Sequence, residues 1–257
     1  MGSTSERNQG IAEQIINIGS KAPSLPLHSF LTPSRPVLLT EEEIFARRSF
    51  AYLDGRRWGL ARSEREALLK VTQEKGAPAT PVYLMEALSD VFEGKPQRAA
   101  NAYLRALRED QEIRNNYVLD FYIVRELIIY LLGAESDDLP SLVTPENVQD
   151  IPLFFSPMAS MLYRSKMDPT VQAVNELGQM ADALINEPGT KRYMAVLLRA
   201  IQGNRLLERG EFAWAGRVLE YTSPRAKKLM GFNEPLIHAV QRDAERAQQG
   251  INYLSYQ

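Results

Sequence analysis

Five times along the chain, a residue whose side-chain oxygen can cap a helix is followed directly by proline. The pairs are Thr80-Pro81, Thr144-Pro145, Ser156-Pro157, Asp168-Pro169 and Ser223-Pro224. In each pair the side-chain oxygen can accept a hydrogen bond from a free amide of the first helical turn, and the proline ring already has the φ angle of the first helical position. Five such helix starts are hard to reconcile with a β-sheet protein, so the pattern predicts an all-α fold.

The other start and stop signals are also helical. Thr40 with Glu43, and Ser63 with Glu66, have the spacing of a capping box. Glycines stand where a left-handed residue would end a helix: Gly76, Gly133, Gly210, Gly231 and Gly250. Strand patterns joined by Asn-Gly or Asp-Gly hairpins are missing from the sequence. We expect helices at residues 40–54, 63–75, 80–93, 96–110, 113–132, 157–165, 169–186, 190–209, 212–222, 224–230 and 234–249.

The chain divides into four regions by its proline and polar content. Residues 1–39 contain four prolines after Gly19 and predict an N-terminal tail that is either extended across a surface or flexible. Residues 40–133 and 156–257 are two helical regions. Residues 134–155 are the only long irregular stretch between them, and we expect a connector there.

Composition excludes several classes of chemistry. The chain has 30 Lys and Arg against 32 Asp and Glu, a formal net charge of −2, which lacks the positive field of a non-specific nucleic-acid binder. It has no cysteine, so disulfides, thiolate metal sites and a cysteine nucleophile are impossible. The first residues resemble no signal peptide, and the apolar stretch at 117–132 carries Asp120, Arg125 and Glu126. We therefore expect a cytoplasmic protein with no transmembrane segment.

Motifs of catalysis and of cofactor binding are missing as well. The two histidines, His28 and His238, cannot form a helically spaced metal pair, and no glycine-rich phosphate loop or nucleophile elbow occurs. The carboxylates at 41–43 and at 135–138 are explained by a helix N-terminus and a solvated loop. We expect no enzymatic activity, no cofactor and no metal.

Two segments share one order of small and aromatic residues around a glycine. In the first, Ala87 precedes Gly94, and Ala99, Tyr103 and Ala106 follow it. In the second, the same internal spacings of 7, 5, 4 and 3 residues separate Gly203, Gly210, Ala215, Leu219 and Thr222. Each segment fits two antiparallel helices, because small residues allow close approach and glycine permits the turn.

Both segments resemble tetratricopeptide (TPR-like) repeats, over about a quarter of the chain. Asp90 and Leu206 depart from the family, which usually has an aromatic residue there, and the copies lie 116 residues apart, which is not a multiple of the 34-residue repeat. The resemblance implies stacked antiparallel helical hairpins, an irregular α-solenoid. An irregular helical bundle that uses similar hairpins is the alternative.

The resemblance also implies a non-enzymatic scaffold or adaptor, a subunit of a larger assembly, whose groove binds a peptide or helix of another protein or a second copy of this chain. Polar residues on the hairpins are the candidate contacts: Arg98, Asn101, Arg105 and Arg217.

A second hypothesis is binding of RNA or other single-stranded nucleic acid, or of an acidic protein segment, at residues 47–65. Arginine interleaved with aromatic residues suits both kinds of ligand. The candidate patch comprises Arg47, Arg48, Arg56, Arg57, Trp58 and Arg62. In contrast, the spacing of Phe121, Tyr122 and Trp214 indicates core or inter-hairpin contacts.

Overall fold

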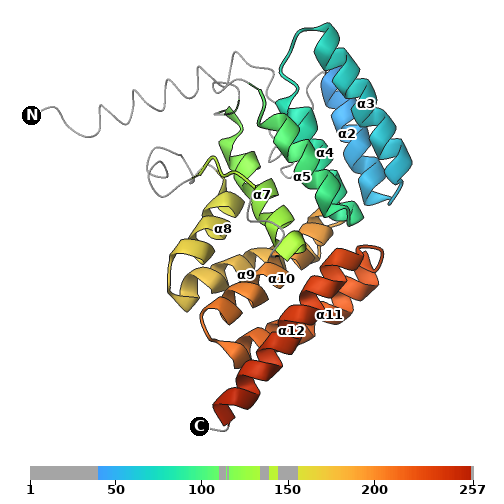
Figure 1. Cartoon of the computed structure of the whole chain (residues 1–257). Coiled ribbons are helices and arrows are strands. Elements are labelled where there is room, and N and C mark those ends of the chain that lie inside the picture. The colour runs from blue at the N-terminus through green and yellow to red at the C-terminus, as the bar shows by residue number, and fades with distance from the viewer. Residues whose placement is uncertain (1–39, 110–113, 115, 134–138, 144–155, 256–257) are drawn as a thin grey trace, which may run out of the picture.

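A computed structural model describes residues 40–109, 114, 116–133, 139–143 and 156–255 (Figure 1). Within these ranges the chain forms ten α-helices and no β-strand, which confirms the predicted all-α class. The predicted tail at 1–39 and most of the predicted connector at 134–155 lie outside the described residues. The helices are α2 (Glu41–Asp54), α3 (Trp58–Glu74), α4 (Thr80–Glu93), α5 (Pro96–Ala106), α7 (Val118–Leu132), α8 (Pro157–Met167), α9 (Val171–Ile185), α10 (Thr190–Glu208), α11 (Phe212–Met230) and α12 (Glu234–Ser255).

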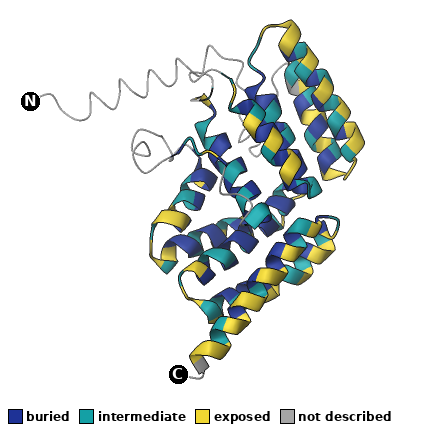
Figure 2. Ribbon diagram, in the orientation of Figure 1, coloured by how far each residue is buried: buried dark blue, intermediate teal, exposed yellow. Residues whose placement is uncertain are grey.

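Helices that follow one another along the chain pack side by side. The most extensive pairs are α2 with α3, α4 with α5, α9 with α10, α10 with α11, and α11 with α12. Helix α7 packs against α4, α5 and α8, and so joins the first four helices to the rest. Figure 2 shows the buried residues concentrated where the helices face one another, while the outer faces of α3, α11 and α12 are exposed.

Small residues and a left-handed glycine form the α4–α5 hairpin. Ala87, Ala99 and Ala106 are completely buried, and the ring of Tyr103 packs edge-on against Phe121 of α7. Gly94 ends α4 with φ of 78°, a conformation that favours glycine. The helix pair predicted around 87–106 is therefore present.

The turn between α11 and α12 packs against the end of this first hairpin. The side-chain amide of Asn233 donates to the carbonyls of Val91 and Phe92, at 2.8 and 3.2 Å, and its oxygen accepts from the Leu236 amide at 3.1 Å. A Cβ atom on Gly94 would lie 2.9 Å from the Asn233 Cα. One buried side chain thus caps the end of α4 and the start of α12 together.

The α10–α11 hairpin has the same construction. Gly210 at its turn has φ of 74°, and a Cβ atom on Gly203 would lie 2.6 Å from Leu219 Cδ2. Ala215 and Leu219 are fully buried at the contact. The second predicted helix pair, around 203–222, is also present.

The N-terminal hairpin also contacts helices far along the chain. The Asp54 carboxylate at the end of α2 accepts from the Thr190 amide at the start of α10, at 2.6 Å. Arg56 donates to the Tyr193 hydroxyl at 3.1 Å and to the Leu229 carbonyl at 2.7 Å. In a strictly one-dimensional array each repeat touches only its neighbours. This chain instead folds back, so that the end of α2 and the turn that follows it contact α10 and α11.

Several helix starts differ from those that the proline dipeptides predict. The Ser156 cap is confirmed, because its hydroxyl accepts from the Ala159 amide at 3.3 Å. Thr80 is instead the first residue of α4, after an Ala79 cap. The Asp168 side chain accepts from the Thr170 amide at 2.8 Å, and α9 begins only at Val171. Thr144-Pro145 lies outside the described residues.

The helix break predicted at Ser223-Pro224 is wrong. Helix α11 runs through Pro224, because Leu219, Thr222, Ala226 and Met230 form one continuous buried stripe across it. The loss of a single backbone hydrogen bond at proline does not outweigh the burial of that stripe.

Three further signals have other roles than the ones predicted. Ser63 lies inside α3, which begins at Trp58, and its hydroxyl donates to the Gly59 carbonyl at 3.2 Å. Gly231 has φ of −59° and is not left-handed. Gly250 lies inside α12, where a Cβ atom would collide with the Phe212 ring at 2.3 Å. This glycine therefore permits close packing of α11 and α12 instead of ending a helix.

Candidate functional site

One face of α11 carries a stripe of aromatic and basic side chains. Its members are separated by three or four residues and so project on the same side of the helix: Trp214, Arg217, Tyr221, Arg225 and Lys228. Arg217, Lys228 and Tyr221 are exposed, and Tyr221 keeps 41% of its surface accessible. Trp214 and Arg225 are half-buried. The stripe therefore offers two aromatic faces to solvent beside cationic groups.

The stripe forms one wall of an open groove of about 610 Å³ between α9, α10 and α11. We call it the Trp214 groove. Its lining residues are Asp182, Arg199, Trp214, Arg217, Val218 and Tyr221. The three helices that form it lie in the C-terminal half of the fold (Figure 1).

Two arginines fix the Tyr221 ring in this groove. The Arg225 guanidinium carbon lies 3.4 Å from the ring centroid, and that of Arg199 lies 5.8 Å from it. Arg225 also donates to the Tyr221 carbonyl at 3.1 Å. Arg199 is held in turn by an ion pair with Asp182 and by a hydrogen bond of 2.6 Å to Gln202. The aromatic surface is therefore ordered before any ligand arrives.

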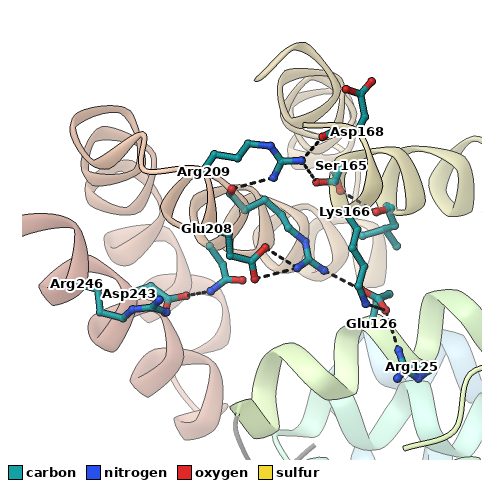
Figure 3. A network of polar contacts seen from close by, with 12 residues as sticks. Arg125, Glu126, Ser165, Lys166, Asp168, Glu208, Arg209, Asp243 and Arg246 are labelled. Carbon is teal, nitrogen blue, oxygen red and sulfur yellow. Dashed lines mark hydrogen bonds and ion pairs between the residues drawn. The ribbon is translucent and has the colours of Figure 1, made fainter. Parts of the chain in front are cut away.

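A buried carboxylate, Glu126, joins α7, α8 and α10 (Figure 3). The Glu126 side chain is 1% exposed. One of its oxygens accepts from Arg125 at 3.1 Å and from Lys166 at 3.0 Å, and the other accepts from Arg205 at 2.9 Å. Three cations around one buried carboxylate offset the cost of its desolvation.

The network continues from α10 to α12. Arg205 also pairs with Glu208 at 2.8 Å. Burial alone would lower the pKa of Arg205, but the carboxylates of Glu208 and Glu126 raise it by more, so the guanidinium stays charged. Further along, the fully buried Asp243 accepts from Asn204 at 3.3 Å and from Arg242 at 3.0 Å. These contacts cross-link the helices.

A second open groove of about 410 Å³ runs along this network between α7, α10 and α12. Its arginines are Arg205, Arg242 and Arg246, and each of them already faces a carboxylate: Glu126 and Glu208 for Arg205, and Asp243 for the other two. Because each arginine of this groove is paired with a carboxylate of the protein, none of these three cations is left for a ligand. These ion pairs therefore stabilise the packing of α7, α10 and α12 and do not form a binding site.

A small, partly open cavity of about 50 Å³ lies between α2, α4, α7, α8 and α10. Apolar side chains line most of it, with Asp120, Ser156 and Thr190 as its polar members. Asp120 is almost fully buried, and burial raises the pKa of its carboxyl to about 7. The cavity has room for one or two waters and is too small for a larger ligand.

The predicted contact residues are divided between two helices. Arg217 lines the Trp214 groove, whereas Arg98, Asn101 and Arg105 lie on α5 and line none of the grooves described above. Arg105 pairs with Glu86 at 2.7 Å and covers the Tyr83 ring at 4.9 Å. Arg98 lies 3.6 Å from the buried Asp90 carboxylate, and Asn101 is exposed. Both arginines therefore tie α5 to α4.

The predicted patch at 47–65 is taken up largely by contacts within the fold. The Arg56 guanidinium covers the Phe232 ring at 5.0 Å, and Trp58 packs on the same ring at 5.2 Å. Arg48 faces Glu64 at 4.0 Å, and Arg62 faces Glu93 at 3.5 Å. Arg47 and Arg57 are exposed.

Sequence reasoning missed Asp182, Arg199 and Tyr221 as members of a site, and it assigned Trp214 to core or inter-hairpin contacts. Trp214 does pack partly on the core, but its remaining surface lines the groove. The spacing of the α11 stripe is the signal that could have identified Trp214 and Tyr221. The contributions of α9 and α10 depend on tertiary packing, which the spacing within one helix cannot show.

Within the described ranges, no group of three His, Asp or Glu residues could hold a metal ion, and no helix is both long and apolar enough to cross a membrane. His238 is exposed on α12. No protein-family model, curated protein or solved structure matches this chain.

Proposed function

We propose that this protein is a non-enzymatic docking scaffold, an adaptor subunit of a larger assembly, and that the Trp214 groove binds a segment of its partner. One observation carries the proposal: Trp214 and Tyr221 lie about two helical turns apart on the same wall of an open groove, with Arg199 and Arg225 holding the tyrosine ring. Trp, Tyr and Arg are the residues that contribute most to protein–protein binding energy.

The way the helices pack supports the same function. Paired helices that present grooves along their length are the usual platform for peptide and helix recognition, and the TPR-like resemblance points the same way. The alternative site at 47–65 has less support, because Arg56 and Trp58 already pack against Phe232.

The proposal is tested by affinity capture with a groove variant. Tagged full-length protein and the double variant Trp214→Ala/Tyr221→Ala are used as baits in one lysate, with Tyr253→Ala as the control. Tyr253 is an exposed aromatic residue, 65% accessible, near the end of α12 and outside the groove. We expect a partner, or a second copy of this chain, that wild type and control retain and that the groove variant loses by tenfold or more.

That loss corresponds to about 1.4 kcal/mol or more, within the range of interface hot spots. Circular dichroism checks that the variant is folded. Capture of the same proteins by all three baits would reject the groove as the docking site.

A further inference from the structure

We infer that the partner segment in the Trp214 groove is acidic: a short peptide stretch with Asp or Glu side chains on either side of an aromatic or aliphatic one. This inference rests on the proposed function and specifies the chemistry of the ligand. It is based on the polar side chains of the groove that have no hydrogen-bond partner in the described part of the chain and can bind a ligand.

Those available groups are mostly hydrogen-bond donors. The side chain of Arg217 makes no hydrogen bond or ion pair with any residue that the structure describes, and neither does the side chain of Lys228 at the far end of the stripe. The indole N–H of Trp214 can only donate. The one carboxylate among the lining residues, Asp182, is already paired with Arg199. A ligand that satisfies this groove must therefore supply acceptors.

The net positive charge of the groove also favours an acidic ligand. Arg199 and Arg217 outnumber Asp182 among its lining residues, and Arg225 and Lys228 add two further cations along the stripe. Carboxylates pair well with guanidinium groups because two parallel hydrogen bonds form at once. The groove is therefore complementary to a negatively charged segment.

Aromatic and aliphatic surface beside the cations adds a second requirement. Trp214, Val218 and Tyr221 contribute apolar surface to the groove wall formed by α11. An apolar side chain of the ligand can cover this surface while its acidic neighbours reach the arginines. From Trp214 to Lys228 the helix rises about 21 Å, which is the length of about six extended residues.

A peptide fits these features better than a nucleic acid. The whole chain has a net charge of −2, and the cations of the stripe are few and concentrated on one helix. Tight binding of a phosphate backbone needs many contacts along a continuous basic track.

The test uses the fluorescence of the groove itself. The chain has two tryptophans, so a Trp58→Phe variant leaves Trp214 as the only one. Seven-residue peptides without tryptophan are titrated into this full-length protein: one of alternating Glu with Leu and Phe, one with Gln in place of Glu, and one with Lys in place of Glu. A seven-nucleotide oligouridylate is the fourth probe.

We expect the Glu peptide to change the Trp214 emission and to bind at least tenfold more tightly than the Gln peptide, with little binding of the Lys peptide. Its affinity should fall as salt rises, because the contacts are largely ionic. Arg217→Glu should weaken it at least tenfold. The matched control is Arg108→Glu, an exposed arginine after α5 that lines no groove described here.

Each other outcome counts against the inference. Equal binding of the Glu and Gln peptides, lost in Tyr221→Ala, would leave the docking groove in place and reject its acidic preference. Binding of no peptide would also reject the acidic preference, and the capture experiment would then decide the proposed function on its own. Tighter binding of the oligouridylate than of any peptide would overturn both.

Discussion

Among single residues, the buried carboxylates of this fold are of two kinds. Glu126 is surrounded by Arg125, Lys166 and Arg205, so its charge is compensated. Asp120 lies in an apolar cavity, where burial is the cause that raises the pKa of its carboxyl to about 7. Folding therefore favours the protonated form of Asp120, because the unfolded chain has an ordinary Asp pKa of about 4.

The stability of the protein should depend on this proton. The folded pKa is raised, so the folded state binds more protons than the unfolded state between about pH 4 and pH 7. Stability contributed by Asp120 is thus present at low pH and is lost as pH rises toward 7. Between pH 5 and pH 8 we expect this group to reduce the free energy of unfolding by about 2–3 kcal/mol.

Asp120→Asn should remove that part of the pH dependence and should be more stable than wild type at pH 8. Urea unfolding of both proteins at pH 5 and pH 8 measures the effect. Glu220→Gln, an exposed residue of α11, is the matched one-atom control. If the free energy of unfolding of Asp120→Asn had the same pH dependence as that of wild type, the raised pKa of Asp120 would be contradicted.

At the scale of helices, the sequence identified which segments pair better than it identified where each one begins. Ser156 caps α8 as predicted, because its hydroxyl meets a free amide. At Pro224 the local signal was overridden by the buried stripe from Leu219 to Met230, and Gly250 proved to be a packing residue against Phe212. A capping residue followed by proline indicates only the local preference for a helix to begin there. Whether the helix does begin there also depends on which residues are buried against other helices.

The small residues of the repeat-like segments were informative for a different reason. A glycine at a helix contact lets any neighbouring helix approach closely, whatever the sequence of that helix. The close helix contact at Gly203 could therefore be predicted without knowing which side chain packs against it. The Trp214 groove could be predicted only in part, through Arg217, because Arg199 and Asp182 come from other helices.

Gly203→Ala tests the close contact of α10 and α11. The new Cβ atom would lie 2.6 Å from Leu219 Cδ2, so one side chain or helix must shift, at a cost of about 1–3 kcal/mol. Gly59→Ala is the control, because its Cβ atom would meet nothing within 4 Å on α3. That variant should instead gain about 0.5–1 kcal/mol from the better helix propensity of alanine. Thermal unfolding of the two variants should therefore shift in opposite directions.

At the scale of the whole molecule, contacts between the first and last helices decide how it unfolds. Arg56 links the turn between α2 and α3 to Leu229 of α11, and Asn233 links the turn that follows α11 to α4. An array without such links can unfold repeat by repeat. We expect this chain to unfold in one cooperative transition.

The two tryptophans allow this to be measured, since Trp58 lies in α3 and Trp214 in α11. Single-tryptophan variants made by Phe substitution should show the same denaturant midpoint. The double variant Arg56→Ala/Asn233→Ala, made in each background, should separate the two midpoints and lower the m-value. Midpoints that differ already without the double variant would show that the long-range contacts do not couple the halves.

The bond from Arg56 to the Leu229 carbonyl spans 173 residues of sequence. At 5–20 residues per second, a ribosome needs roughly 10–35 s to make the second partner after the first. For most of that interval the nascent α2–α3 hairpin has no α10 to pack against, and the α11–α12 turn with the ring of Phe232 is made only at its end. The apolar face of Trp58 therefore has no Phe232 ring to pack on until residue 232 has been made, so the α2–α3 hairpin is a segment that a chaperone would protect.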